Sequence, residues 1–77
     1  MNGKTTSLDC VPLGCKVYVT ALLPNAALRR LLDLGLVEGA GVEPLFCSPS
    51  GGTRAYFLRG AVIALRPDVA SKIMVEL

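Results

Sequence analysis

Hydrophobic and polar residues alternate along several short stretches of the chain, and this alternation predicts β-strands. In the stretch CKVYVTALL, which begins at residue 15, valine and alanine on one side oppose tyrosine, threonine and leucine on the other. Further strands are predicted over residues 42–47, 53–59, 61–65 and 72–77, with glycine- or proline-containing turns before most of them. The strand over 53–59 carries apolar residues on both sides, which predicts that both of its faces are buried.

Residues 26–34 break this alternation and predict one short α-helix. Leu28, Leu31 and Leu32 recur at the spacing of a single helix face. Asn25 is a candidate N-cap, because its side chain can accept a hydrogen bond from a free backbone N–H of the first turn. A helix of about nine residues does not persist alone in water, so it must dock on the strands.

Glycines are predicted to set the turns around this helix. Gly35 ends it, because glycine adopts the left-handed conformation without a steric penalty, and Leu36 can then fold back on Leu31. Gly39 turns the chain toward the strand over 42–47. Gly60 closes a tight hairpin between the two strands on either side of it.

This order of elements predicts a mainly β fold. We expect a small, closed or nearly closed β-barrel of about five strands, with the 26–34 helix capping one end and a short helical turn at RPDVAS, because closure removes free strand edges. An open α+β sheet of the same elements is the alternative. Residues 8–77 form one domain in this interpretation, and the polar residues 1–7 form a flexible tail.

Apolar residues make up 52% of the 77 positions, which is more than a single small core can bury. A membrane span is not expected, since the longest uncharged apolar stretch, 17–28, is well short of the roughly 20 residues required. No secretory signal is recognised, and the chain is expected to be cytoplasmic. The apolar residues that the core cannot bury are therefore expected on a surface that a partner protein covers.

The polar residues exclude several functions. A net charge of +2 is too small to predict nucleic-acid binding. The three cysteines, Cys10, Cys15 and Cys47, lack the histidine or fourth cysteine of a structural metal site, so they are expected to be buried or half-buried free thiols. With no histidine and no paired acids, no catalytic residue, cofactor or enzymatic activity is predicted.

Three segments resemble the FeoA family when they are taken together: RRLLDLGLVEGAGVEPL, SPSGG and LRGAVIALRPDVASKIMVEL. Pro44 departs from the family pattern, which tends to carry a β-branched residue there. The resemblance implies an SH3-like barrel and a small cytoplasmic accessory of bacterial ferrous iron uptake. It implies contact with the cytosolic part of the FeoB membrane transporter and no catalytic activity.

On this basis we expect a partner-binding face around the helix and its stop, formed by Leu23, Arg29, Arg30, Leu34 and Val37. Plain core packing is the alternative for the leucines on the predicted helix face.

Other functions compatible with a small barrel are an iron-responsive, metal-sensing domain and a nucleic-acid binder. Weak self-association through the strand that contains Pro44 is a further possibility, because proline cannot donate a ladder hydrogen bond and so favours a sheet edge or a bulge.

Overall fold

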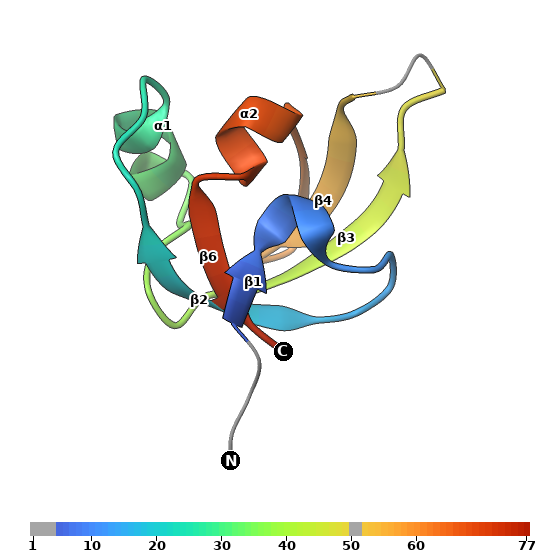
Figure 1. Cartoon of the computed structure of the whole chain (residues 1–77), viewed down its shortest axis with the longest axis horizontal. Coiled ribbons are helices and arrows are strands. Elements are labelled where there is room, and N and C mark those ends of the chain that lie inside the picture. The colour runs from blue at the N-terminus through green and yellow to red at the C-terminus, as the bar shows by residue number, and fades with distance from the viewer. Residues whose placement is uncertain (1–4, 50–51) are drawn as a thin grey trace.

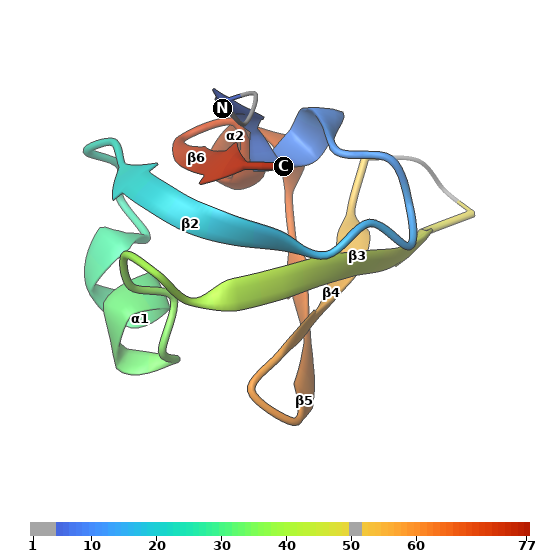
Figure 2. The same ribbon diagram turned by 90° about the horizontal axis from the view of Figure 1, so that it is seen from below.

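A computed structural model describes residues 5–49 and 52–77 of the chain. Six strands of this part form one antiparallel sheet in the order β1-β6-β2-β3-β4-β5. Figure 1 shows the strands curling around a common interior, and Figure 2 shows β4 and β5 crossing β2 and β3 at a steep angle. The bounds are β1 Thr5–Ser7, β2 Val17–Leu22, β3 Gly41–Cys47, β4 Arg54–Leu58, β5 Ala61–Leu65 and β6 Ile73–Glu76.

Three short helical segments complete the structure. They are the 3-10 turn η1 Leu8–Cys10, the helix α1 Leu28–Asp33 and the helix α2 Pro67–Ala70. The predicted mainly β fold with one capping helix and a helical turn is confirmed, with six strands rather than five. Strands β1 and β5 end the sheet order and do not pair with each other, so the barrel is curled but not fully closed.

The core lies inside this curled sheet and is entirely apolar apart from one phenol. Every element except β1 and β5 places a residue there that is at most 2% exposed. The largest of these side chains are Tyr56, Leu8, Leu31, Leu36, Leu58 and Ile73.

The expected flexible tail over residues 1–7 is wrong for its last three positions. Residues 5–7 form β1 and pair with β6, from Thr5 opposite Glu76 to Ser7 opposite Met74. Residues 1–4 lie outside the described part. The segment TTS has no apolar alternation to signal a strand, but threonine suits extended backbone, and an edge strand is held mainly by its ladder hydrogen bonds.

Pro44 lies in β3, where β2 pairs with Gly41 and Val42 only, so Pro44 itself has a strand partner on one side, β4. β3 runs between β2 and β4, and its register with β4 shifts between Pro44 and Phe46, so the alternative prediction of a bulge is confirmed. The bulge accommodates a residue that cannot donate to the ladder.

β4 is buried less completely than predicted. Tyr56 and Leu58 face the core and Ala55 is also buried, whereas Phe57 is 44% exposed on the outer face of the sheet. One face of β4 therefore packs inward, and the other presents an aromatic ring to solvent.

Helix α1 is shorter than predicted and begins at Leu28. The Oδ1 atom of Asn25 accepts a 2.8 Å hydrogen bond from the Ala27 N–H, so Asn25 stabilises the turn that leads into the helix rather than capping the helix itself. Of the three predicted core leucines, Leu31 is fully buried, Leu28 is half-buried and Leu32 is 44% exposed. The helix has too few turns to bury a wider stripe than one leucine.

The predicted helix stop at Gly35 is confirmed. Gly35 has φ +101°, the Leu36 N–H donates to the Leu31 carbonyl and the Gly35 N–H donates to the Leu32 carbonyl, at 3.0 Å each. These two bonds are the Schellman pattern. Leu36 is consequently buried in the same cluster as Leu31.

The other two predicted turn glycines also adopt positive φ angles, +88° at Gly39 and +86° at Gly60. Arg59 precedes Gly60 with φ +52°, and Leu58 pairs with Ala61. Two successive positive φ angles define a type I′ turn, whose twist matches that of the paired strands. The β4–β5 hairpin is therefore a tight two-residue hairpin, as predicted.

Arg54 ties β4 to the N-terminal segment. Its Nη1 and Nη2 atoms each donate a 2.6 Å hydrogen bond, to the carbonyls of Asp9 and Val11, and its guanidinium lies 5.6 Å from the centre of the Tyr56 ring. The sequence indicated nothing more than a surface cation at this position. The fork-shaped guanidinium can donate to two carbonyls at once, and it thereby joins β4 to η1 and the residue that follows it.

The buried phenol of Tyr56 predicts a loss of stability in alkali. Burial raises the pKa of its hydroxyl above the ordinary value of 10.0, and the Arg54 guanidinium opposes this rise. The unfolded chain therefore releases this proton first, so the stabilisation is complete below about pH 10 and falls as pH rises through the folded pKa. Urea unfolding from about pH 8 to about pH 11 is expected to show this fall.

The variant Tyr56→Phe serves as the control for this pH dependence. Its free energy of unfolding should decline less steeply above about pH 10, because the phenol that titrates is absent. Parallel declines in the two proteins would show that Tyr56 does not carry the effect.

Candidate functional site

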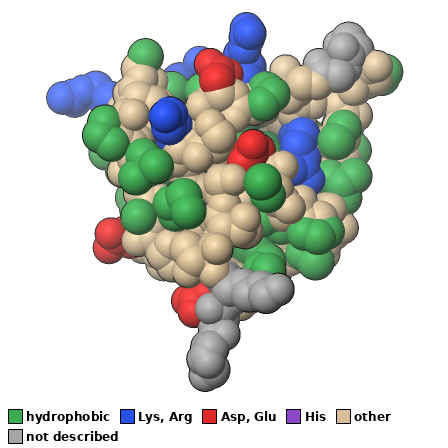
Figure 3. Space-filling model, in the orientation of Figure 1, with side chains coloured by type: hydrophobic (Ala, Val, Ile, Leu, Met, Phe, Trp, Pro, Cys, Tyr) green, Lys and Arg blue, Asp and Glu red, His purple; other side chains and the backbone are tan. Residues whose placement is uncertain are grey.

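Large apolar side chains remain on the surface, as the composition predicted. Figure 3 shows hydrophobic side chains close together over the part of the molecule where α1 and the end of β2 lie in Figure 1, next to Lys or Arg side chains. The exposed large apolar residues are Leu13, Tyr18, Leu23, Leu32, Leu34, Val37, Phe46, Phe57, Val62 and Leu77. Four of the ten belong to α1 or to the segments that flank it.

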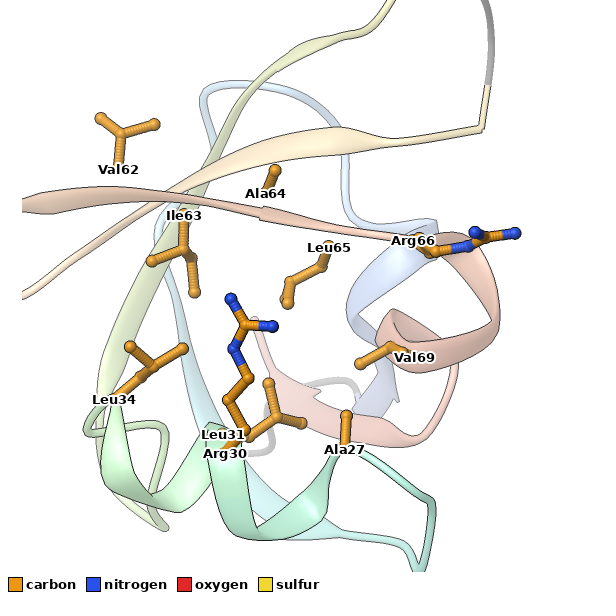
Figure 4. Close-up of a pocket in the computed structure, with 10 residues that line it drawn as sticks. All are labelled: Ala27, Arg30, Leu31, Leu34, Val62, Ile63, Ala64, Leu65, Arg66 and Val69. Atoms are coloured by element: carbon orange, nitrogen blue, oxygen red, sulfur yellow. The ribbon is translucent and has the colours of Figure 1, made fainter.

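A groove of about 460 Å³ separates α1 from β5 and α2, and we call it the β5 groove (Figure 4). Ile63 and Leu65 point from β5 into this groove, whereas Val62 and Ala64 point to the opposite side of the strand. The groove is lined by Ala27, Arg30, Leu31 and Leu34 around α1, by residues 62–66, and by Val69 of α2.

Arg30 is the charged group that extends across the β5 groove. Its guanidinium points from α1 toward β5, into the space beside Ile63 and Leu65 (Figure 4). No acidic residue lines the groove. Within residues 5–49 and 52–77, the one ion pair joins Arg66 to Asp68 at 3.7 Å, and both side chains are largely exposed. Arg30 therefore has no carboxylate partner in this part of the chain.

The structure divides the predicted partner-binding residues among different places. Arg30 and Leu34 lie together in the β5 groove. Arg29 lies with Leu32 on another side of α1, in a separate hollow. Leu23 and Val37 are exposed but line neither hollow.

Sequence reasoning missed the contribution of β5 to this surface. Val62, Ile63 and Leu65 come from a strand that was predicted, but nothing in a run such as AVIAL indicates whether it lies in the middle or at the edge of a sheet. The absence of any charged residue over residues 60–65 is more typical of an interior strand, because exposed edges usually carry a charge, so the sequence offered no signal for this edge.

Cys10, Cys15 and Cys47 are free thiols as predicted, but all three are exposed rather than buried or half-buried. Cys10 is the last residue of η1, Cys47 is the last residue of β3, and Cys15 lies in the loop before β2. Within the described residues, no group of three or more Cys, Asp or Glu side chains lies in a position to hold a metal ion. Neither α1 nor α2 has the length or apolar character to cross a membrane.

Six antiparallel strands that curl around one core, with a short helix capping one end, define a small barrel of the SH3-like class. A family model of the FeoA domain matches residues 6–77. The chain therefore belongs to the FeoA domain family, as the sequence resemblance indicated. No curated protein matches the sequence significantly.

Solved structures of similar proteins agree with this assignment. A FeoA-like protein from Clostridium acetobutylicum is 31% identical with a TM-score of 0.86, over 100% of this chain and 90% of that one. FeoA from Chlorobium tepidum is 32% identical with a TM-score of 0.86, over 94% and 70%.

A third similar structure is FeoA from Stenotrophomonas maltophilia, which is 27% identical with a TM-score of 0.81, over 91% of this chain and 88% of that one. It was solved with zinc and is described as an SH3 domain protein and a candidate activating factor for ferrous iron transport. The family is thus linked to ferrous iron transport.

Proposed function

We propose that this chain is a small cytoplasmic accessory protein of ferrous iron uptake that binds the cytosolic part of a FeoB-type membrane transporter. The contact surface is the α1 face, which we define as Leu23, Arg29, Arg30, Leu34 and Val37. It has no catalytic role in this proposal. The chain acts through the free energy with which it binds the transporter.

The observation that carries the proposal is the exposure of apolar side chains around α1. Leu23, Leu34 and Val37 are 41%, 41% and 39% exposed, and Arg30 lines the same groove as Leu34. An apolar centre with arginine at its border is the composition that protein interfaces favour. Family membership supports the choice of an iron transporter as the partner.

Regulation through such a contact requires a difference in affinity. A transporter whose cytosolic part has two conformations changes its populations when the accessory protein binds one of them more tightly. Equal affinity for both conformations would leave transport unchanged, however tight the complex. The proposal therefore includes selective binding to one conformation of the transporter.

The variant Val37→Asp is expected to weaken capture of the purified cytosolic domain of the transporter by at least about tenfold, because a carboxylate would have to be desolvated at the interface. Calorimetry or a pull-down with the purified domain measures the loss. Leu34→Asp should behave in the same way.

Leu13→Asp is the matched control for these variants. Leu13 is 48% exposed in the loop between η1 and β2, away from α1, so the same change of chemistry there should leave binding unaltered. Unchanged capture by both Val37→Asp and Leu34→Asp would remove the α1 face from the proposal.

A further inference from the structure

Strand β5 is a free sheet edge without the features that usually protect one. It ends the sheet order, and residues 60–65 contain no charged residue and no proline. Val62 is 57% exposed and Ala64 is also exposed. Proteins normally blunt such edges with charges, proline or a covering segment, because an open apolar edge pairs with other strands.

The register of the β4–β5 hairpin shows which backbone groups are available. Across the two-residue turn, Leu58 pairs with Ala61, Tyr56 with Ile63 and Arg54 with Leu65. In such a hairpin these alternate pairs exchange hydrogen bonds, so the N–H and C=O groups of Val62 and Ala64 point away from β4. In the part of the chain that the structure describes, no backbone or side-chain partner binds them.

The β5 groove lies directly beside this edge. A strand added next to β5 would place alternate side chains on the same side as Ile63 and Leu65, which is the side that faces α1. The guanidinium of Arg30 extends into that space from α1, and no acidic residue lines the groove. A carboxylate on the added strand would therefore meet an arginine that lacks an acidic partner.

We infer that β5 binds an extended segment of a partner protein by strand addition, and that this segment carries an acidic side chain opposite Arg30. The inference rests on the proposed function for the source of the segment, the cytosolic part of the transporter. A second copy of this chain fits the edge less well, because β5 of another copy would bring another Arg30 and no acid from residues 60–65.

The first test uses a short capped peptide in which valine alternates with aspartate, together with a counterpart that has lysine in place of aspartate. Added to the isotope-labelled protein, the aspartate peptide should slow hydrogen exchange at the Val62 and Ala64 amides and shift their resonances. It should bind at least about tenfold more tightly than the lysine peptide, since charge-assisted hydrogen bonds are the stronger ones. Equal binding of both peptides, or no change at β5, would overturn the inference.

Two variants separate the backbone contact from the charge. Ala64→Pro removes an outward N–H while leaving the β4 pairs intact, and should abolish protection at Val62, whereas Ala64→Val keeps the N–H and should bind as the wild type does. Arg30→Gln should lower affinity for the aspartate peptide to about that for the lysine peptide. If Ala64→Pro does not fold, an aspartate peptide methylated on its pairing amides replaces it, and undiminished binding of that peptide contradicts strand addition.

The purified cytosolic domain of the transporter distinguishes this inference from the proposed function. Protection of the Val62 and Ala64 amides by the domain supports both. Binding of the domain without this protection overturns strand addition by the transporter and leaves the accessory role in place. Binding of the aspartate peptide without any binding of the domain contradicts the proposed partner and retains β5 as a strand-accepting edge. A rise in mass to a dimer on light scattering, lost in Ala64→Pro, would assign the edge to a second copy and overturn the inference.

Discussion

Replacing Leu31 by alanine is expected to lower the free energy of unfolding by about 3 kcal/mol. Leu31 is 1% exposed and is the fully buried side chain of α1. Its loss leaves a cavity between the helix and the core and removes the side chain that Leu36 packs toward in the same cluster. For a domain of this size, about 3 kcal/mol is a large part of the total stability.

The adjacent residue provides the control for this prediction. Leu32 has the same chemistry one position along the same helix but is 44% exposed, so Leu32→Ala should cost less than about 1 kcal/mol. Urea unfolding followed by far-ultraviolet circular dichroism measures both variants at neutral pH. Similar losses in the two would show that the burial of Leu31 is not what holds α1 in place.

The variant Arg54→Met is expected to destabilise the protein by about 2–4 kcal/mol. The Asp9 and Val11 carbonyls would lose their 2.6 Å hydrogen bonds from the guanidinium, and the edge between η1 and β4 would open. Methionine retains much of the apolar length of the side chain, so the loss reports the polar contacts. Hydrogen exchange should also accelerate in η1 and the loop that follows it.

Arg54→Lys and Arg66→Met are the controls for Arg54→Met. A lysine ammonium lacks the rigid fork that reaches both carbonyls, so Arg54→Lys should recover a minor part of the stability. Arg66 is exposed, and its ion pair with Asp68 is open to solvent, so Arg66→Met should change the free energy of unfolding by less than about 1 kcal/mol. Full recovery of the free energy of unfolding in Arg54→Lys would show that a positive charge, without the two-pronged guanidinium, is enough to join η1 to β4.

These two stability predictions concern side chains that hold the fold together, although Leu31 also lines the β5 groove. Leu31 holds α1 on the barrel from beneath, and Arg54 closes the barrel at η1. The α1 face and the β5 groove meet at Arg30 and Leu34. Variants of those two residues therefore test binding, while Leu31→Ala and Arg54→Met test the scaffold that positions them.

Local signals in the sequence were sufficient for most elements and turns. The alternation from residue 15 predicted β2, Gly35 predicted the helix stop, and Gly60 predicted the β4–β5 hairpin. Each of these depends on the conformational preferences of a few neighbouring residues, which are the same wherever the segment lies in the fold. The family could be recognised from the same motifs.

The candidate site was predicted less completely. Exposure of Leu23, Leu34 and Val37 follows from their positions at the ends of elements, and the structure agrees with it. Burial of Leu28 and Leu32 with Leu31 was expected from helix spacing, but one turn of α1 contacts the core closely enough to bury a single leucine. The part played by β5 was missed because its neighbours in space were unknown.

By itself, the sequence determined five of the six extended segments, where the helix ends, and that apolar side chains exceed what a small core can hold. The tertiary structure alone decided that β3 lies between β2 and β4, that β5 is a free edge, and that Arg54 reaches Asp9 and Val11. The physical reason is the separation along the sequence of the residues that interact. Turn and strand preferences arise between adjacent residues, whereas an edge or a groove exists only after strands distant in sequence have paired.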